Sequence, residues 1–324
     1  MPRKGKRSIG MLRLRSVEHL CHHLRTNPRE LAYIAAHIDR YYHCFQLTST
    51  GGKPRPIAHP TGRLEQILKR LNELLQRLTL PDAVHGGRRG RSNLTNAMAH
   101  VGAKALVKAD IKDFFPSIKS GRVYDTFARR CQCSPDVARI LTRLTTYKGA
   151  LPQGSPTSMV VAALVSEPLV QRLQALADSH GGTLTQYVDD TSLSGPEHVR
   201  RLKGVVARII EQEGFTVSQH KTGAPRYGAE KVVTGVRIGR SIGVPSAYLD
   251  EVERALNDIT SSISGGPPIE PSRLHSIRAK ILYVNRLDAG KGAQLRHQLR
   301  QLEGARQSQG RPRPHMHTGV SKKP

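Results

Sequence analysis

The sequence contains few cysteines, few aromatic side chains and no long hydrophobic run. None of its 324 residues is Trp, and Phe, Trp and Tyr together make up 4%. Four cysteines are too few for a disulfide framework in a chain of this length: Cys21, Cys44, Cys131 and Cys133. His22 and His23 follow Cys21, but no C-x-x-C spacing supports a zinc site. Buried thiols beside surface histidines are the simpler interpretation.

The sequence also contains no segment with the pattern of a membrane-spanning helix or of a secretion signal. The longest apolar run, residues 159–165, is far shorter than the roughly 20 residues that a spanning helix needs. The basic stretch at 1–15 lacks the apolar core of a signal peptide. We therefore expect a soluble cytoplasmic protein.

Acidic residues are scarce relative to basic ones. The chain has 51 Lys and Arg against 25 Asp and Glu, a formal net charge of +26. The expected partner of such a charge is a polyanion, because each neutralised phosphate releases counterions. The charge is spread along the whole chain, which argues against one membrane-binding amphipathic helix. Composition alone leaves open a generic basic protein of the ribosomal type.

Hydrophobic periodicity divides the chain into helical and extended segments. Helices are expected at 1–45, 63–80, 156–173, 199–213 and, with a break at 264–271, 249–302. Ser155 is the expected N-cap of the third of these, with Pro156 in its first position. Extended segments are expected as a hairpin at 45–60, a strand at 104–115, a second hairpin at 182–195 and a strand at 230–239. This order predicts an α+β fold with an antiparallel sheet.

Two adjacent carboxylates, Asp189 and Asp190, lie at the tip of the second predicted hairpin, in "QYVDDTSLSG". Like charges side by side repel, so the pair calls for a counter-charge. Together with Asp110 at the end of a predicted strand, they suit a divalent-metal site for Mg²⁺ and phosphates. An Asp-Asp turn that faces water is the alternative. The spacing does not prove that Asp110 meets Asp189.

Five strings occur in an order that resembles the reverse transcriptases. "ADIKDFFPSI", "LPQGSPTS" and "QYVDD" resemble the palm motifs, "GKPRPI" the fingers motif and "GFTVSQHKT" the motif after the catalytic hairpin. The resemblance covers about residues 50–240. "RSNLTNAMAH" matches the N-A-x-x-H signature of retron reverse transcriptases, and "VVTGVRIG" contains their V-T-G triplet. The resemblance implies a right-hand polymerase fold with fingers, an antiparallel-sheet palm and a helical thumb.

By this resemblance, the catalytic residues are Asp110, Asp189 and Asp190, which with the carbonyl of Ile111 would hold two Mg²⁺ ions. The dNTP-binding residues would be Lys53, Arg55, Phe115, Gln153, Gly154 and Lys221. Phe115 would exclude a ribose 2′-hydroxyl, and Lys221 would donate a proton to pyrophosphate. For Lys53 and Arg55 the alternative is an exposed basic hairpin without a ligand. For Phe115 it is a core aromatic residue, and for Lys221 a solvated lysine. The residues expected near RNA or primer are Asn96, His100, Tyr187, Val233, Thr234 and Gly235. Asn96 and His100 are interpreted as buried hydrogen-bonding groups that organise the RNA-facing surface.

The expected organisation is an N-terminal helical segment (1–45), fingers (46–100), palm with part of the fingers (101–244), thumb (245–303) and a basic disordered tail (304–324). Resemblance to retrons implies copying of a structured non-coding RNA into branched, RNA-linked single-stranded DNA. It also implies dNTP substrates, an effector protein and a role in antiphage defence in bacteria. Another bacterial reverse transcriptase remains an alternative: a diversity-generating, group II intron-like or abortive-infection type. The second alternative is a non-catalytic RNA-binding protein with a polymerase fold.

Overall fold

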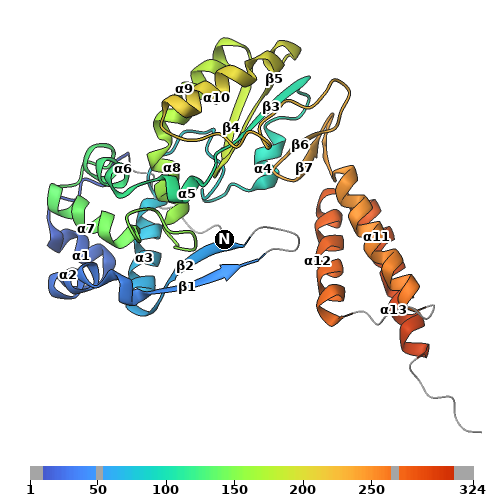
Figure 1. The fold of residues 1–324 in the computed structure, drawn as a ribbon, viewed down its shortest axis with the longest axis horizontal. Helices are drawn as coiled ribbons and strands as arrows, with labels where there is room; N and C mark the ends of the chain where they lie inside the picture. Colours follow the sequence, from blue (N-terminus) through green and yellow to red (C-terminus); the bar gives the residue numbers. More distant parts are fainter. Residues whose placement is uncertain (1–9, 49–53, 264–269, 310–324) are drawn as a thin grey trace, which may run out of the picture. The chain divides into compact units, whose positions relative to one another are not determined.

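The computed structural model describes residues 10–48, 54–263 and 270–309, which form two compact units. The first unit comprises residues up to Thr234 together with Ile238–Ser241. The second comprises Gly235–Arg237 and the chain from Ile242 onward. Mixed helices and antiparallel sheets make up the first unit, as Figure 1 shows, and the second is mainly helical.

A helical layer opens the first unit. It contains α1 (Val17–Leu24), α2 (Pro28–Ala36), α3 (Gly62–Leu75) and α7 (Pro135–Thr145), which pack on one another. The Ser16 and Asn27 side chains cap the first two helices by accepting backbone N–H bonds from His19 and Glu30. The predicted helical stretch at 1–45 was wrong at its end. After the short 3₁₀ helix η1 (Ile38–Tyr41) the chain becomes a strand, because the aromatic residues Tyr42 and Phe45 favour extended backbone.

The first predicted hairpin is confirmed. Strand β1 (Tyr42–Leu47) pairs antiparallel with β2 (Arg55–Pro60), from Tyr42 opposite Pro60 to Leu47 opposite Arg55. Most of β1 is exposed. Lys53 lies outside the described residues. The following helix α3 ends at Leu75, before the predicted stop at Pro81.

A three-stranded antiparallel sheet forms the centre of the first unit, in the order β3-β5-β4. Its strands are β3 (Ala105–Asp110), β4 (Thr183–Tyr187) and β5 (Asp190–Gly195). The second predicted hairpin is therefore confirmed. Val107, Leu184 and Leu193 share one face by register and join the main core. Helices α9 (Glu167–Ser179) and α10 (Lys203–Gln212) contact β4 and β3 (Figure 1).

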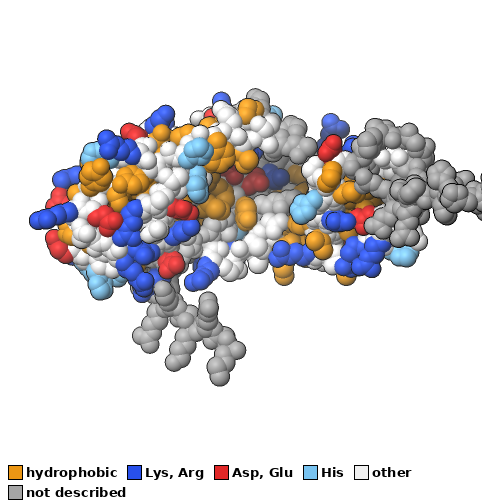
Figure 2. All heavy atoms as spheres, turned by 90° about the horizontal axis from the view of Figure 1, so that it is seen from below, with side chains coloured by type: hydrophobic (Ala, Val, Ile, Leu, Met, Phe, Trp, Pro, Cys, Tyr) orange, Lys and Arg blue, Asp and Glu red, His pale blue; other side chains and the backbone are white. Residues whose placement is uncertain are grey.

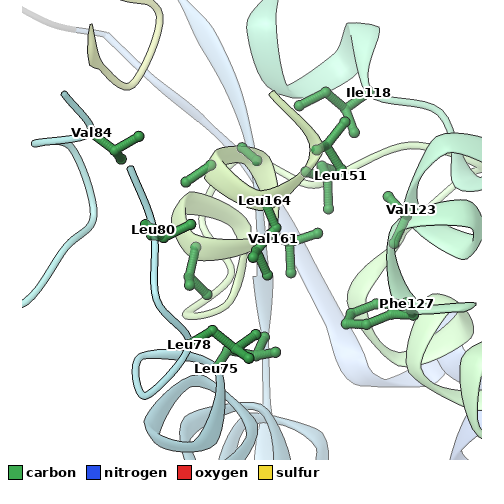
Figure 3. Packing of buried hydrophobic residues seen from close by; sticks show 14 of the residues in the cluster. Leu75, Leu78, Leu80, Val84, Ile118, Val123, Phe127, Leu151, Val161 and Leu164 are labelled. Carbon is green, nitrogen blue, oxygen red and sulfur yellow. The ribbon is translucent and has the colours of Figure 1, made fainter. Parts of the chain in front are cut away.

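Helix α8 (Ser158–Val165) lies at the centre of the hydrophobic core. Figure 3 shows its Val161 and Leu164 among side chains from two other stretches of the chain, Leu75–Val84 and Ile118–Leu151. The second stretch follows α5 (Phe114–Ser117) and includes α6 (Ser120–Asp125) and the π-helical turn η2 (Thr126–Arg130).

The predicted N-cap at Ser155 was wrong. Helix α8 begins at Ser158, and the Ser155 hydroxyl pairs with that of Thr157 at 3.1 Å. The Ser158 hydroxyl donates to the Pro152 carbonyl at 2.6 Å, which leaves residues 152–157 as turns. No single helix in the described ranges has the length and apolarity to cross a membrane. Helices α8 and α9 taken together have the length and composition of a membrane span, but the chain bends by 57° between them.

The strand predicted at 230–239 is two short strands, β6 (Lys231–Val233) and β7 (Val236–Ile238). Thr234 and Gly235 separate them with φ angles of 45° and 77°. Because the left-handed region is incompatible with a continuous strand, the V-T-G triplet forms a turn. Before it come η3 (Glu197–Leu202) and α10, and after it β8 (Ile242–Gly243).

The second unit contains α11 (Ser246–Ile263), α12 (Pro271–Leu287) and α13 (Ala289–Gln309) around a core of its own. Val252, Ile281 and Leu295 are buried there. The predicted onset of disorder at Gly304 was wrong by at least six residues, because α13 continues to Gln309. One helical glycine costs about 1 kcal/mol, which the good helix formers around it can offset.

Candidate active site

The sheet register brings the three aspartates together. Asp110, the last residue of β3, is directly opposite Asp190, the first residue of β5. The Ile111 N–H donates to the Asp189 carbonyl at 3.0 Å, which ties the end of β3 to the turn of the hairpin. Directly opposed residues have Cβ atoms about 5 Å apart. The predicted meeting of Asp110 with the Asp189-Asp190 pair is therefore observed.

Burial and mutual repulsion perturb the two turn aspartates. The pKa of Asp189 is raised, first by burial and then by the neighbouring charges of Asp110 and Asp190. Burial likewise raises the pKa of Asp190, and Lys108 opposes the shift. A raised carboxyl pKa means that the ionised form lacks sufficient positive charge nearby. A cation bound at this place would therefore stabilise the ionised form of both carboxylates.

Lys221 supplies part of that positive charge. Its ammonium group donates to both carboxylate oxygens of Asp110, at 3.1 and 3.3 Å. The segment around it is fixed to β3: the Ser218 N–H donates to the Asp110 carbonyl, and the Asp110 N–H donates to the Thr222 hydroxyl. The side chain of Lys221 remains about half exposed, so it could also reach a ligand.

The turn of the hairpin is strained and closely supported. Val188 has a φ of 61°, an unfavourable region for a β-branched residue. The Gln186 side-chain amide donates to the Val188 carbonyl at 3.0 Å, and a Cβ placed on Gly86 would lie 2.3 Å from the Val188 nitrogen. The His85 N–H also donates to the Gln186 carbonyl at 2.8 Å. Sequence reasoning missed these supports, and the adjacent glycines in "HGG" were the available signal.

The predicted dNTP-binding residues come from segments that are far apart in the sequence, and two of these segments contact each other. The Ala58 N–H of β2 donates to the Gln153 carbonyl at 2.8 Å. Gly154 has a φ of 117°, and a Cβ there would lie 2.7 Å from the Ile57 side chain. Only glycine suits such a conformation and approach. Arg55 is exposed at the start of the same strand.

The two adjacent phenylalanines differ in environment. Phe114 is buried at 4% exposure, with its ring centroid 5.7 Å from that of Phe215. Phe115 is half-buried and packs against the edge of the core. The segment that carries both lies beside the glutamine loop, since the Leu151 N–H donates to the Ile118 carbonyl at 3.0 Å. Of the two rings, Phe115 is the one available to a ligand, and Tyr187 at the hairpin is likewise half-buried.

Asn96 and His100 are each 1% exposed, as the prediction of buried hydrogen-bonding groups required. The His100 ring nitrogens are 2.7 Å from the Ser194 and Thr185 hydroxyls. The Asn96 amide donates to the Thr234 hydroxyl at 3.2 Å. Val233 is buried, Thr234 is half-buried and Gly235 is exposed. The two retron-like motifs therefore contact each other.

The residues present fit a divalent cation by their chemistry. Three carboxylates and the Ile111 backbone gather at one sheet end, and hard oxygen ligands suit Mg²⁺. Within the described ranges, however, no three His, Cys, Asp or Glu side chains are arranged as a ligand set, and Lys221 is paired with Asp110. A bound cation would compete with this ion pair.

Basic and acidic side chains are interspersed on the described surface. Figure 2 shows Lys and Arg side chains spread over the visible face, with carboxylates and histidines between them. Several of the described cations are engaged in ion pairs, for example Arg63 with Glu30 and Arg130 with Glu167. The excess of unpaired positive charge follows from the +26 composition and suits a polyanionic ligand.

Comparison with known proteins identifies the family. A family model described as reverse transcriptase (RNA-dependent DNA polymerase) matches residues 49–232, more than half of the chain. The chain is 30% identical to the retron Mx162 reverse transcriptase of Myxococcus xanthus, covering 92% of this chain and 69% of that protein. It is 25% identical to the retron Ec86 reverse transcriptase of Escherichia coli, covering 92% of each.

Among solved structures, telomerase from Candida albicans in complex with a fragment of telomeric RNA is similar at a TM-score of 0.45 and 10% identity. The match covers 82% of this chain and 64% of that one. The family match, the retron relatives and the carboxylate cluster agree with one another. The chain belongs to the reverse transcriptase family, RNA-directed DNA polymerases with a right-hand fold, and within it to the retron type.

Proposed function

We propose that this reverse transcriptase copies part of a structured non-coding RNA into single-stranded DNA that stays joined to the RNA through a branch. The priming group would be a 2′-hydroxyl of a guanosine in the same RNA. The observation that carries this proposal is the hydrogen bond from Asn96 to Thr234, which unites the two retron-like motifs. The enzyme would work with an effector protein in defence against phage.

The reaction would be an in-line attack of the primer hydroxyl on the α-phosphorus of a dNTP. A bond from the primer oxygen to phosphorus forms, the bond to the β-phosphate oxygen breaks, and pyrophosphate leaves. Asp110, Asp189, Asp190 and the Ile111 carbonyl would hold Mg²⁺. The bound cations would neutralise the phosphate oxygens that gain charge in the transition state. The raised pKa values of Asp189 and Asp190 support a cation at this place.

The other polar residues would bind and orient the dNTP. Arg55, and Lys53 beside it in the sequence, would bind the triphosphate, since the Arg fork matches phosphate oxygens. Gly154 would let the backbone approach the nascent base pair, Gln153 would contact its sugar or base, and Phe115 would exclude a ribose 2′-hydroxyl. Lys221 would leave Asp110 for the departing pyrophosphate, which its half-exposed side chain allows.

The RNA-facing surface would include Tyr187 beside the primer terminus and the turn of Val233, Thr234 and Gly235. We assign residues 46–100 to the fingers, 101–244 to the palm and 245–303 to the thumb. Arg and Lys side chains of α12, among them Arg273, Arg278 and Lys280, would contact nucleic acid phosphates, although each now pairs with a carboxylate.

Sequencing of the nucleic acid that co-purifies with the protein tests the proposal. We expect one RNA species with DNA attached, whose DNA is released as a single strand after RNase and debranching treatment. The Asp189→Asn protein should retain the same RNA without DNA. Unlinked DNA copied from many RNAs would contradict the branched product and favour another type of bacterial reverse transcriptase.

A further inference from the structure

Helix α4 (Asn93–Met98) and the two residues after it carry buried polar groups that the reaction itself does not use. The helix begins with a capping box: the Ser92 hydroxyl accepts from the Thr95 N–H, and the Thr95 hydroxyl accepts from the Ser92 N–H. This cap fixes the start of a helix of only six residues. Residues 93–100, which we call the α4 brace, are therefore held firmly at their beginning.

One end of the α4 brace contacts both strands of the catalytic hairpin. The two His100 ring nitrogens are 2.7 Å from Thr185 of β4 and Ser194 of β5. A neutral imidazole has one donor and one acceptor nitrogen, and each hydroxyl can serve the complementary role. His100 is thus a clamp between two strands that are otherwise joined by their backbone ladder.

This clamp acts on the face of the sheet that carries the aspartates. The register pairs Thr185 with Ser192, Tyr187 with Asp190, and Asp190 with Asp110. Alternate residues of a strand share a face, so Thr185 and Ser194 lie on the same face as Asp190. Ser194 is four residues from Asp190 along β5, about 13 Å at the usual rise per residue.

The middle of the α4 brace contacts the V-T-G turn. The Asn96 amide donates to the Thr234 hydroxyl at 3.2 Å, and that hydroxyl lies 3.3 Å from the Asn93 carbonyl, to which it can donate. Thr234 has a φ of 45°, so the turn is in a conformation that needs external support. Asn96 and Asn93 provide this support through three hydrogen bonds to one residue, since the Asn93 amide also donates to the Thr234 carbonyl.

Burial makes these contacts specific. Burying an amide or an imidazole is unfavourable unless it is hydrogen-bonded, and an apolar side chain of the same volume would pack there without that requirement. Burial lowers the pKa of His100 to about 4, so the ring is neutral at physiological pH and keeps its donor-acceptor pattern. The Asn96 side-chain oxygen is buried and has no hydrogen-bond partner among the described residues, so the arrangement costs stability. That cost favours a role in placing its two contact surfaces relative to each other.

We propose that the α4 brace couples the Thr234 turn to the catalytic hairpin, with Asn96 and His100 as positioning residues. RNA that docks on the turn would then act on the orientation of Asp189 and Asp190 through these two side chains. The hairpin part of the inference needs only the polymerase reaction. The RNA part rests on the proposed function.

The first test measures single-nucleotide extension of a primed RNA template by His100→Ala, His100→Gln and the wild type. Burst amplitude gives the fraction of active molecules, and the burst rate gives the rate of nucleotide addition by each active molecule. We expect His100→Ala to lower the burst rate about tenfold to a hundredfold. The apparent dNTP affinity should change by less than about threefold, because no dNTP contact is lost. His100→Gln, which can keep one of the two hydroxyl contacts, should recover part of the rate.

Leu31→Ala is the matched control, because Leu31 is fully buried in α2, which packs against α1 and α7. It should lower thermal stability and burst amplitude and leave the burst rate unchanged. A burst rate of folded His100→Ala within about twofold of the wild-type rate would overturn the clamp. Failure of the wild type to extend any primed template would instead contradict the polymerase activity, so the two failures are distinguishable.

The second test addresses the RNA part with Asn96→Ala, Thr234→Val and the double variant. The stimulation of burst rate by the co-purifying RNA, relative to a generic primed template, should be lost equally in all three. Full stimulation in either single variant would overturn the coupling, as would a further loss in the double variant that equals the sum of the two.

Discussion

Asp189 and Asp190 show at the scale of single residues how the site combines strain with charge. Val188 precedes them in the left-handed region, and both carboxyl pKa values are raised. Neither feature stabilises the fold, so both must be maintained by their surroundings. Gly86, the Gln186 amide and the Lys221 ammonium provide that support through close packing, a hydrogen bond and a salt bridge.

The contrast between Phe114 and Phe115 leads to a prediction about sugar selection. Phe115→Val should raise rNTP incorporation relative to dNTP, because it removes a half-exposed ring without opening the core. Discrimination by the size of a pocket is worth about 1–3 kcal/mol, so we expect a change in selectivity of about 10-fold to 200-fold. The measurement is the ratio of kcat/KM for dGTP and GTP on the same primed template.

Phe114→Leu is the control for this experiment. Phe114 contacts the ring of Phe215 in the core, so its substitution should lower stability and leave the dGTP to GTP ratio unchanged. Relaxed selectivity in Phe114→Leu, with normal selectivity in Phe115→Val, would show that the aromatic wall is the other phenylalanine.

Part of the site could be predicted from the sequence because its acidic residues lie in short local motifs. Asp110 and the Asp189-Asp190 pair were predictable as strand-end acids, and their meeting then follows from an antiparallel sheet. Gly86 and the partners of His100 were not predictable, because each contact joins segments about 85 to 100 positions apart. No local periodicity reports such pairings.

At the scale of secondary-structure elements, prediction succeeded where local pattern and tertiary packing agree. Both hairpins and the helices of the second unit follow the sequence pattern closely. Prediction failed where a hydrogen bond to a distant or buried group changes the local backbone conformation. The Ser158 hydroxyl bonds to Pro152 and shifts the start of α8, and the support of Thr234 by α4 makes a turn inside an apparently continuous strand.

The attachment of α4 to the hairpin through a neutral histidine predicts a pH-dependent stability. His100 has a pKa of about 4 in the folded protein, below its usual value near 6.5. The unfolded chain therefore binds a proton that the folded chain excludes. The free energy of unfolding should fall as pH drops from about 6.5 to about 4, by roughly 2 kcal/mol at pH 5 from this group.

Urea unfolding of the wild type and His100→Gln at pH 7 and pH 5 measures this contribution. The wild type should lose more stability between the two pH values than the variant, because glutamine does not titrate. Other groups, including His85 and the aspartates, contribute to both proteins and cancel in the comparison. An equal loss in both proteins would contradict a neutral, buried His100.

At the scale of the whole molecule, the fold separates the chemistry from non-specific attraction. The net charge of +26 is distributed along the chain, and we expect it to supply salt-sensitive affinity for nucleic acid. We assign the chemistry to one sheet end in the first unit, where β3 and β5 place Asp110 opposite Asp190 and the hairpin turn carries Asp189. Changing one of those carboxylates should therefore abolish synthesis and leave nucleic acid binding nearly intact.

Extension of a primed RNA template by Asp189→Asn, with RNA affinity and thermal stability measured on the same preparation, tests this claim most directly. The variant removes one of two adjacent half-buried charges, so its stability without divalent cations should equal or exceed that of the wild type. The account predicts no detectable dNTP incorporation at any Mg²⁺ concentration, with RNA affinity nearly unchanged. Near-normal extension by the folded variant would contradict the assignment of Asp189 and the active site built around it.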